Sequence, residues 1–408
     1  MATGSFSALA RHWQLDPAVV FLNHGSFGAC PTVVLQAQRA LQDRMEAEPV
    51  RFMVRELADL AAQARQALAS LLGCEADDLV LLDNATAAVN TVVRSLTWRP
   101  GDELLVVDHV YNACRNAAEA ELARFGATVN VAVLPFPNTT PDAVVAAVLA
   151  AVTPRTKLVL LDHITSPTGL VLPVEQLVPL LQDRGVDVLV DGAHAPGMLP
   201  LQLDQLGAAY FTGNCHKWLC TPKGCAFLHV RRDRQHLLRP LSVSHGWNRR
   251  QPGDSPLRAL FDWTGTSDPT AHLVLPQAIA FLAGLLPGGL AALQAHNHAL
   301  ALQGRDLLCA AVGTTPPAPD SMLGSLAAVV LPPLVVPPVP ALAHEPLHPL
   351  QEYLWQHHQI EVPIIAFGDQ LLVRIAMQAY NSLAQVQRLA DVLAGLRADI
   401  GGAAVTQT

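Results

Sequence analysis

The sequence predicts an α/β protein that has a large, mostly parallel sheet domain and a smaller α+β C-terminal domain. Short apolar runs rich in Val and Leu recur along the first part of the chain, and helical patterns lie between them. The runs are continuous rather than alternating, which is typical of strands that helices cover on both faces. Because strands and helices alternate over about residues 70–235, parallel connections are expected there. At 408 residues, the chain is also too long for one small core.

The limits of the apolar runs define the expected elements of the large domain. Strands are predicted at Leu79–Leu82, Leu104–Val107, Val129–Leu134, Lys157–Leu161, Asp187–Val190, Ala208–Phe211 and Ala226–Val230. Helices are predicted between them at Ala85–Leu96, Asn112–Phe125, Pro141–Val152 and Pro173–Gln182.

Polar residues stand where several of these strands end. Asn84-Ala85-Thr86 follows the first strand, Asp108-His109 the second and Asp162-His163 the fourth. Asp191 follows the fifth strand, and residues 212–217 follow the sixth. In open α/β sheets, ligands bind outside the carboxyl ends of the strands. These residues are therefore expected to share one site.

The composition changes after about residue 268, where the smaller domain is expected to begin. We predict an N-terminal arm over residues 1–20, a large domain over 21–268, a small domain over 269–400 and a disordered tail over 401–408. In the small domain, helices are predicted at Ala271–Leu285, Leu290–Val312, Leu350–Gln359 and Ser382–Ala398, and strands at Leu326–Leu331 and Leu371–Ala376.

The bulk composition argues against several classes of function. The net charge of -8 disfavours a nucleic-acid partner, which binds mainly through neutralised phosphates. The apolar stretch 323–343 contains prolines such as Pro332 and Pro337, which one spanning helix does not tolerate, so no membrane association is expected. The first residues lack the apolar core of a signal peptide, and the seven cysteines form no CxxC pair. A cytoplasmic protein with free thiols is expected.

A carboxylate and a lysine give the clearest chemical signal. Asp191 opens the segment Asp-Gly-Ala-His, which ends at His194, and Lys217 lies in a loop after the next strand. An enzyme that uses pyridoxal 5'-phosphate (PLP) needs this pair, because the lysine amine condenses with the cofactor aldehyde and the carboxylate pairs with the pyridinium nitrogen. Taken singly, the lysine could be loop surface and the aspartate a helix cap.

Several longer segments identify the chain by resemblance. They are NHGSFG at 23–28, DHITSPTG at 162–169, DGAHAPG at 191–197, GNCHKWLCTPKG at 213–224 and VRIAMQAYN at 373–381. Together they resemble the class V aminotransferase family of fold-type I PLP enzymes, and its isopenicillin N epimerase-like branch in particular. The resemblance covers about residues 20–395.

The resemblance implies that PLP is the cofactor and that Lys217 both binds it covalently and moves the substrate Cα proton. It places Asp191 at the ring nitrogen, His194 near the ring, and the helix start Asn84-Ala85-Thr86 at the phosphate. His109 would stack on the ring, with Tyr111 as the rival aromatic residue. The other residues expected at the cofactor are Thr165 or Ser166 at the ring oxygen, and His216 and Thr266 at the phosphate.

The resemblance also implies how a small amino-acid substrate binds. Arg374, inside an apolar strand, would hold the α-carboxylate, and the loop with Asn23 and His24 would close over the substrate. In the family, a threonine at the position of Thr266 comes from the partner subunit. A homodimer with shared active sites is therefore expected.

The reaction is open between two alternatives that begin with the same Cα carbanion. Epimerisation is the activity of the branch and needs a proton donor on each face, such as Lys217 and Tyr111. A carbon–sulfur β-lyase acting on a cysteine conjugate or sulfoxide is the alternative. A cysteine desulfurase is disfavoured, because residues 315–345 contain no cysteine that could accept sulfur. A metal hydrolase is a remote alternative, suggested by 16 histidines, but it would leave Lys217 without a role, so no metal ligands are predicted.

Overall fold

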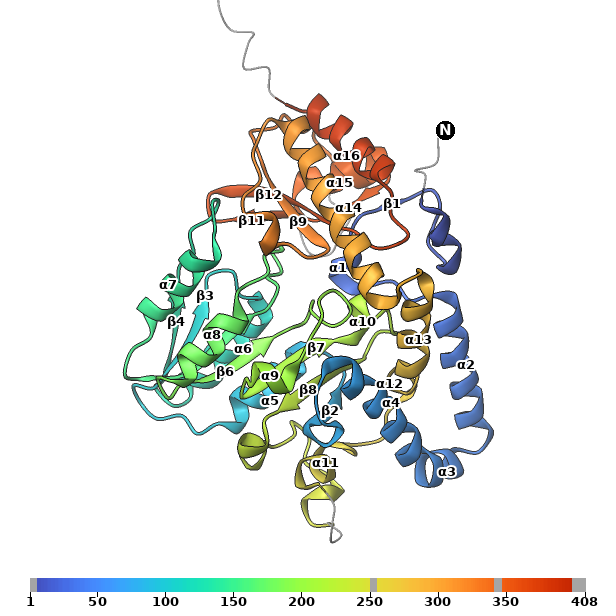
Figure 1. Cartoon of the computed structure of the whole chain (residues 1–408), viewed down its shortest axis with the longest axis vertical. Helices are drawn as coiled ribbons and strands as arrows, with labels where there is room; N and C mark the ends of the chain where they lie inside the picture. The colour runs from blue at the N-terminus through green and yellow to red at the C-terminus, as the bar shows by residue number, and fades with distance from the viewer. Residues whose placement is uncertain (1–5, 250–254, 341–346, 398–408) are drawn as a thin grey trace, which may run out of the picture.

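The computed structural model describes residues 6–249, 255–340 and 347–397 (Figure 1). Its main feature is a seven-stranded sheet with the strand order β2-β8-β7-β6-β5-β3-β4. The strands are β2 (Leu79–Leu82), β3 (Glu103–Val107), β4 (Thr128–Ala132), β5 (Thr156–Asp162), β6 (Asp187–Asp191), β7 (Tyr210–Asn214) and β8 (Ala226–Val230). Strand β8 runs antiparallel to both neighbours, and the other pairings are parallel. The predicted mostly parallel sheet is confirmed.

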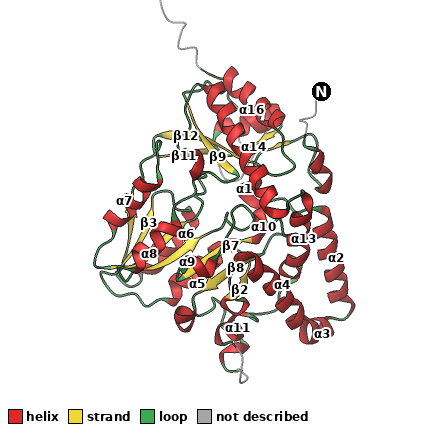
Figure 2. Ribbon diagram, in the orientation of Figure 1, coloured by secondary structure: helices red, strands yellow, loops and turns green. Residues whose placement is uncertain are grey.

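Helices cover both faces of this sheet, as the yellow strands between red helices show in Figure 2. The helices of the large domain are α4 (Leu57–Leu72), α5 (Ala85–Ser95), α6 (Asn112–Ala123), α7 (Pro141–Ala151), α8 (Val174–Gln182), α9 (Leu203–Leu206), α10 (Cys215–Trp218) and α11 (Pro256–Phe261). Successive residues of a strand point to opposite faces. Leu105 therefore packs in the core that includes α4, α7 and α8, while Leu104 packs in the core with α5, α6 and α11. This explains why the strands read as continuous apolar runs.

A second, smaller sheet lies at the top of Figure 1, in orange and red. It has the order β11-β12-β9 and is antiparallel, with β9 (Leu326–Leu331), β11 (Ile364–Phe367) and β12 (Gln370–Ala376). Helices α14 (Gly289–Val312), α15 (Pro349–His358) and α16 (Leu383–Gly395) belong to this part of the molecule. The predicted α+β character of the small domain is confirmed, whereas the predicted tail 401–408 lies outside the described residues.

The N-terminal segment is joined to the small domain rather than only to the large one. Strand β1 (Val20–Phe21) pairs in parallel with β10 (Ile360–Glu361). Val20 and Leu22 are buried in the same core as β9, β12 and α16. The first strand therefore lies beside residues that come more than three hundred positions later in the sequence. Phe21 O also accepts a hydrogen bond from Asn381 Nδ2, 360 positions away.

Two long helices precede the first strand of the large sheet and were not among the predicted elements. They are α2 (Thr32–Ala47) and α4, and the short α1 (His24–Phe27) and α3 (Pro49–Arg51) lie next to them in the chain. Helix α4 buries Leu68 and Leu72 one turn apart. It ends where Gly73 adopts a left-handed φ of 65°, a conformation that glycine adopts at little cost.

The predicted helix Ala271–Leu285 is wrong as a single element. The chain forms α12 (Thr270–Leu273) and then α13 (Leu275–Leu285), with Val274 between them. Pro276 explains the break, because proline has no backbone N–H to continue the hydrogen bonding of the preceding turn. Among the described residues, no single helix is long and apolar enough to cross a membrane. The bent helix pair Thr270–Leu285 and Gly289–Val312 is long and apolar enough only when its two helices are taken together.

Candidate active site

The carboxyl edge of the large sheet gathers the polar residues that follow its strands. Asp162 and Asp191 end the neighbouring strands β5 and β6 and are paired in register. Asn214 ends β7, and α10 with Lys217 follows directly. Asn214 Oδ1 accepts a hydrogen bond of 2.9 Å from Ala85 N, which ties the end of β7 to the start of α5. The predicted convergence of strand ends is present in the structure.

Lys217 is held beside a neutral histidine. Its Nζ lies 3.1 Å from His194 Nε2, and Trp218 Nε1 donates to His194 Nδ1 at 3.3 Å. An indole nitrogen can only donate, so Nδ1 is the acceptor and a neutral ring carries its proton on Nε2. Burial lowers the pKa of His194 well below its usual value, so the ring is neutral. Lys217 Nζ can accept this proton when its own amine is unprotonated.

The electrostatics of the site make the unprotonated amine more accessible than it is in an ordinary lysine. Burial lowers the pKa of Lys217 from 10.5 to about 8, and the charge of Arg374 contributes in the same direction. A lysine amine with this pKa is a usable nucleophile and base near neutral pH. The surroundings of Lys217 therefore fit condensation with an aldehyde cofactor.

Asp191 is a buried carboxylate, 3% exposed, whose known partners are neutral. Its Oδ1 accepts from Ala193 N at 3.0 Å, and its Oδ2 accepts from Cys114 Sγ at 3.2 Å. Burial raises the pKa of Asp191. A cation against this carboxylate would restore the ionised form, because an opposite charge favours it. The protonated ring nitrogen of PLP is such a partner, so the residue fits its predicted role.

Asp162 is a second buried carboxyl at this edge and was not among the predicted cofactor residues. Its Oδ1 accepts from Tyr111 N at 3.3 Å, while its Oδ2 has no hydrogen-bond partner among the described residues. Burial and the charge of Asp191 raise its pKa well above the usual value. The sequence feature that could have identified Asp162 as a site residue is its position at the end of an apolar strand.

The start of α5 suits an anion. Asn84 caps this helix by accepting from Ala87 N at 2.8 Å, and Ala85 N is held by Asn214. The first-turn amides and the positive end of the helix dipole face the same region, with the half-buried Thr86 between them. Because the amides of Ala85 and Ala87 are engaged, this helix start would hold the phosphate of PLP through the helix dipole and the amide and hydroxyl of Thr86.

The two other residues predicted to contact the phosphate, His216 and Thr266, lie in different surroundings. His216 Nδ1 donates to Cys225 O at 3.0 Å, and burial followed by the charge of Lys217 lowers its pKa to about 4. A phosphate next to this ring would raise that pKa, because opposite charge favours the protonated form. Thr266 is exposed in the loop between α11 and α12, so its predicted role depends on a partner subunit. Both roles stay predictions.

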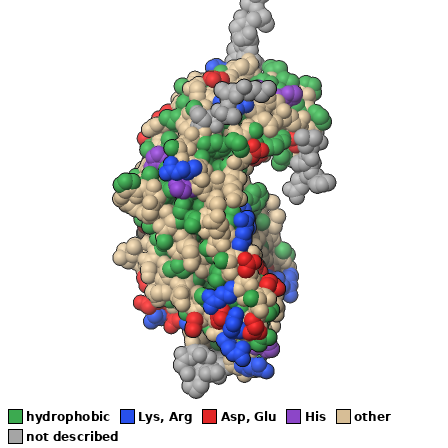
Figure 3. Space-filling model, turned by 90° about the vertical axis from the view of Figure 1, so that its right-hand side faces the viewer, with side chains coloured by type: hydrophobic (Ala, Val, Ile, Leu, Met, Phe, Trp, Pro, Cys, Tyr) green, Lys and Arg blue, Asp and Glu red, His purple; other side chains and the backbone are tan. Residues whose placement is uncertain are grey.

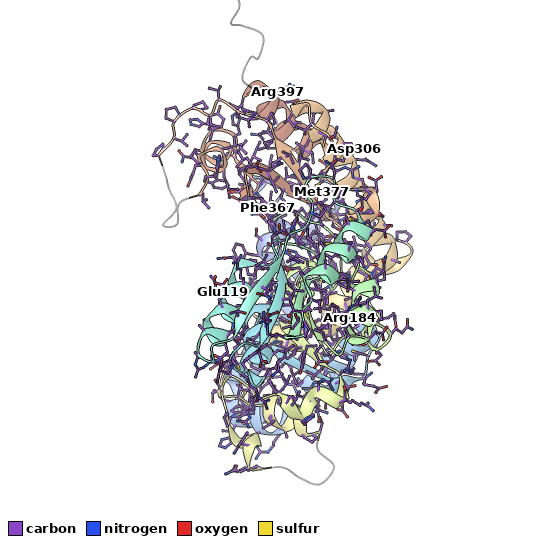
Figure 4. The ribbon with its side chains drawn as sticks, turned by 90° about the vertical axis from the view of Figure 1, so that its left-hand side faces the viewer. Glu119, Arg184, Asp306, Phe367, Met377 and Arg397 are labelled. Atoms are coloured by element: carbon purple, nitrogen blue, oxygen red, sulfur yellow. The ribbon has the colours of Figure 1, made fainter. Side chains whose placement is uncertain are left out.

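His109 and Tyr111 lie at the end of β3 in different environments. His109 is fully buried, its Nδ1 lies 2.8 Å from Asp108 Oδ1, and its Nε2 has no partner among the described residues. Its ring centroid is 4.5 Å from that of Phe367, which is labelled in Figure 4 where the small domain meets the large one. Tyr111 is 46% exposed, and burial raises its pKa, so its hydroxyl is protonated at neutral pH.

The structure separates the two candidates for the ring oxygen of PLP. Thr165 Oγ1 lies 2.7 Å from Thr168 Oγ1 and accepts from Leu170 N at 2.9 Å, so this hydroxyl stabilises its own turn. Ser166, in contrast, contacts Arg374 through its carbonyl and, at 3.3 Å, through its hydroxyl. Thr165 is thus engaged within its own turn and Ser166 with Arg374, and the contact of either residue with the ring oxygen stays a prediction.

Arg374 reaches the site from the middle of β12 and is 4% exposed. Its NH2 group also donates to Ser26 Oγ at 3.4 Å, and its Nε has no partner among the described residues. Burial lowers the pKa of the Arg374 guanidinium to about 10, which still leaves it charged at neutral pH. A buried guanidinium without a carboxylate partner favours an incoming anion, as expected for a substrate α-carboxylate.

The N-terminal loop presents a different residue from those predicted. Asn23 Nδ2 donates to Glu361 Oε1 at 2.9 Å, and His24 lies 3.0 Å from Lys217 O through Nε2. These side chains bind other protein groups, whereas Ser26 reaches Arg374. Gly28 brings this loop against the lysine loop: with φ at 70°, a Cβ there would lie 2.0 Å from His216 O.

Metal-binding patterns occur in the chain but not beside Lys217. The spacing HxH is present at His296 and His298, where His298 Nδ1 contacts Gly324 O at 3.1 Å. The spacing HExxH at 344–348 falls partly outside the described residues, and His348 caps α15. Among the described residues, the one group that could hold a metal is Asp78, Asp204 and His229, at the opposite end of β8 from the lysine loop. A metal hydrolase at the predicted site is not supported.

Lys217, Asp191 and the start of α5, set at the carboxyl edge of a seven-stranded sheet, define a PLP-dependent enzyme of fold type I. A family model described as Aminotransferase class-V matches residues 20–331, and the chain belongs to this family. The predicted family and cofactor are confirmed.

Relatives with different names resemble this chain over most of its length. Isopenicillin N epimerase of Streptomyces clavuligerus is 34% identical over 408 residues, which cover 97% of this chain and 99% of that protein. Putative L-cysteine desulfhydrase 1 of Oryza sativa subsp. japonica is 32% identical, with 94% of this chain and 84% of that protein covered. The solved complex of the cystine C–S lyase C-DES with cysteine persulfide has a TM-score of 0.76 at 24% identity, covering 93% and 98% of the two chains. This last likeness concerns the fold.

Proposed function

We propose that this protein epimerises an amino acid at Cα, with Lys217 moving the proton on one face. The observation that carries the proposal is the buried Lys217 Nζ, which lies 3.1 Å from His194 Nε2 and whose pKa burial lowers to about 8. An amine with this pKa can take a proton from carbon near neutral pH more readily than an ordinary lysine can. Bound PLP supplies the electron sink that stabilises the resulting negative charge.

Arg374 would bind the substrate α-carboxylate. Its free Nε and the neighbouring hydroxyls of Ser26 and Ser166 offer donors in one place. A two-point contact between guanidinium and carboxylate fixes the orientation as well as the position of the substrate. The Cα–H bond would thereby be directed at Lys217.

Tyr111 would supply the proton on the opposite face. Its hydroxyl is protonated at neutral pH, and it lies near enough to Arg374 and Asp191 for their charges to affect its pKa. With a half-exposed side chain, Tyr111 can also exchange its proton with water. Two proton donors at one carbon are what epimerisation requires.

A carbon–sulfur β-lyase is the second candidate, favoured by the desulfhydrase relatives that match most of this chain. The same Cα deprotonation would begin the reaction, a thiol would leave from Cβ with the Cα–H electron pair forming the Cα–Cβ double bond, and hydrolysis of the remaining enamine would give pyruvate and ammonia. The stretch 315–345 contains no cysteine to accept sulfur, so a protein-bound persulfide is not part of this alternative.

Product analysis in deuterated water tests the two candidates. The holoenzyme is incubated with peptide-like amino acids that carry a free α-amine and α-carboxylate and with cysteine conjugates, and products are assayed for Cα deuterium, configuration and pyruvate. Deuterium with inverted configuration supports epimerisation, while pyruvate with released thiol supports the lyase. Alanine together with enzyme-bound sulfur would contradict both. Reduction of the holoenzyme with borohydride and peptide mass spectrometry should independently locate the cofactor on Lys217.

We also propose a homodimer in which Thr266 of each subunit completes the phosphate site of the other. Exposed apolar side chains that such an interface could cover include Val54, Val243 and Trp247. Mixing a Lys217→Ala variant with a Thr266→Ala variant tests this, because one hybrid site would retain both residues. Activity recovered only after subunit exchange supports shared sites, and a monomer with full cofactor occupancy in sedimentation contradicts them.

A further inference from the structure

A cluster of polar residues lies at the end of β8 that is remote from Lys217. His229 pairs in register with Leu79 of β2 and with Phe211 of β7. Asp78 precedes Leu79 at the end of a short 3-10 helix, Ala76–Asp78, and Asp204 lies in α9. Three segments distant in sequence thus bring an imidazole and two carboxylates together.

His229 is an unusual member of the core. It is 3% exposed, and neither Nδ1 nor Nε2 has a hydrogen-bond partner among the described residues. Buried polar atoms without partners are costly, which indicates that a partner of another kind is missing. A neutral imidazole offers the lone pair of one ring nitrogen to a metal ion.

Both carboxylates lie close to this imidazole. Asp204 Oδ1 is 3.5 Å from His229 Nε2, and one ligand atom from each of the three residues lies within 4.8 Å of the others. Metal–ligand distances of about 2.0–2.2 Å place two ligands of a tetrahedral ion roughly 3.5 Å apart. The Asp204 side chain is 50% exposed, so it is free to rotate and bring its carboxylate to the shorter distance that a bound ion requires.

We propose that His229, Asp204 and Asp78 bind a divalent transition-metal cation, such as Zn²⁺, at this end of the sheet. One neutral imidazole and two carboxylates are suitable ligands for such an ion, and their two negative charges would balance it. Water would complete the coordination on the exposed side of Asp204. The cation would join α9 and the start of β2 to β8.

Arg232 is the competitor that the cation must displace. Its Nε lies 3.2 Å from both oxygens of Asp78, and Gln235 Nε2 donates to Oδ1 of the same carboxylate at 2.8 Å. The Arg232 side chain is 70% exposed, and ion pairs with one such exposed partner contribute little. Arg232→Ala should therefore strengthen cation binding, which a purely structural ion pair would not do.

Metal titration of the holoenzyme tests the proposal. After treatment with a chelator, ZnCl₂ is titrated by calorimetry, and CoCl₂ is followed by its visible absorption as a second probe. One equivalent per chain is expected. Asp204→Asn and His229→Gln should each weaken binding by at least the roughly tenfold that loss of an outer-shell partner already costs. His236→Gln, which removes a nearby exposed histidine, is the matched control and should bind normally.

Thermal unfolding gives a second readout that does not depend on activity. Zn²⁺ should raise the Tm of the wild-type holoenzyme by mass action, and Asp204→Asn should lose this rise. Because Asp204 is half exposed, that variant should fold even if His229→Gln does not. Absence of binding by the wild type, or equal binding by Asp204→Asn, would overturn the proposal and leave only the 3.5 Å contact between His229 and Asp204.

Discussion

Charged side chains lie at both edges of the seven-stranded sheet, but they have different partners. At the amino edge, Glu103 begins β3 with a side chain that is 3% exposed, and Arg155 NH2 lies 2.6 Å from its carboxylate. Asp187, which begins β6, is paired with Arg234 at 2.7 Å. Acidic and basic side chains also lie mixed over the lower part of the face shown in Figure 3.

The carboxyl edge has buried charged groups without such pairs. Among the described residues, Asp191, Lys217 and Arg374 form no ion pair, although all three lie out of bulk solvent. An unpaired buried charge costs stability, so its presence is better explained by a ligand than by folding. This difference in ion pairing indicates that the charged groups of the amino edge stabilise the sheet, whereas those of the carboxyl edge are arranged for a cofactor and a substrate.

Removing the lysine should have the largest effect on the carboxyl edge. Lys217→Ala loses the base and the covalent attachment point, so turnover should fall by at least roughly 10³-fold. Cofactor affinity should decrease less, because Asp191 and the start of α5 remain. Steady-state kinetics and equilibrium dialysis with PLP measure the two quantities. Near-normal turnover would show that another group moves the proton.

Removing the arginine should weaken substrate binding without destabilising the fold. Arg374→Leu loses charge-assisted hydrogen bonds of about 1.5–3 kcal/mol, so KM should rise roughly 10- to 100-fold. Because the native guanidinium is buried without a carboxylate, Tm should not decrease. Arg374→Lys should fail to restore KM, since an ammonium lacks the planar fork. A loss of stability with unchanged KM would place Arg374 among the structural charges instead.

The pH dependence of cofactor loading should report the environment of Lys217. Only the unprotonated amine condenses with PLP, so the loading rate of the apoenzyme should rise with pH and level off above about 8. With an ordinary lysine, the loading rate would continue to rise up to a pH of about 10.5. Arg374→Leu removes a nearby positive charge and should shift the midpoint to higher pH. Stopped-flow absorbance at several pH values makes the comparison.

The smallest effect is expected at the amino edge. Arg155→Ala leaves the Glu103 carboxylate with Thr153 as a remaining partner, at 2.5 Å. The loss should be about 1 kcal/mol of unfolding free energy, because the Arg155 side chain itself is 68% exposed. Calorimetry should find a lower Tm, while kcat and KM stay unchanged. An effect on kcat would break the proposed division between the two edges.

The large sheet could be predicted closely because its strands are buried on both faces. Burial on both faces gives continuous apolar runs, and the parallel connections bring the strand ends to one edge. Asp191, Lys217 and the start of α5 followed from that rule together with the family resemblance. Helix α2 was missed because Val34 is its one buried residue, so its sequence has little apolar signal.

The substrate side of the site depends on contacts that no local pattern encodes. Arg374 meets Ser26 across 348 positions of sequence and Ser166 across 208. The sequence marks Arg374 as a charge inside an apolar strand, but it does not say which loop residue will face it. That choice follows from how the N-terminal segment packs on the small domain, which placed Ser26 rather than Asn23 beside the guanidinium.

The pairing of the first ordered strand with the last part of the chain bears on protein synthesis. Leu22 O accepts from Ala376 N at 2.8 Å, and His24 Nδ1 lies 2.8 Å from the Tyr380 hydroxyl. Residues near position 22 are synthesised long before their partners at 376 and 380. The mostly parallel sheet over residues 79–230 can therefore form before the N-terminal segment finds these partners, and the contact of His24 with Tyr380 is made only after the C-terminal strand exists.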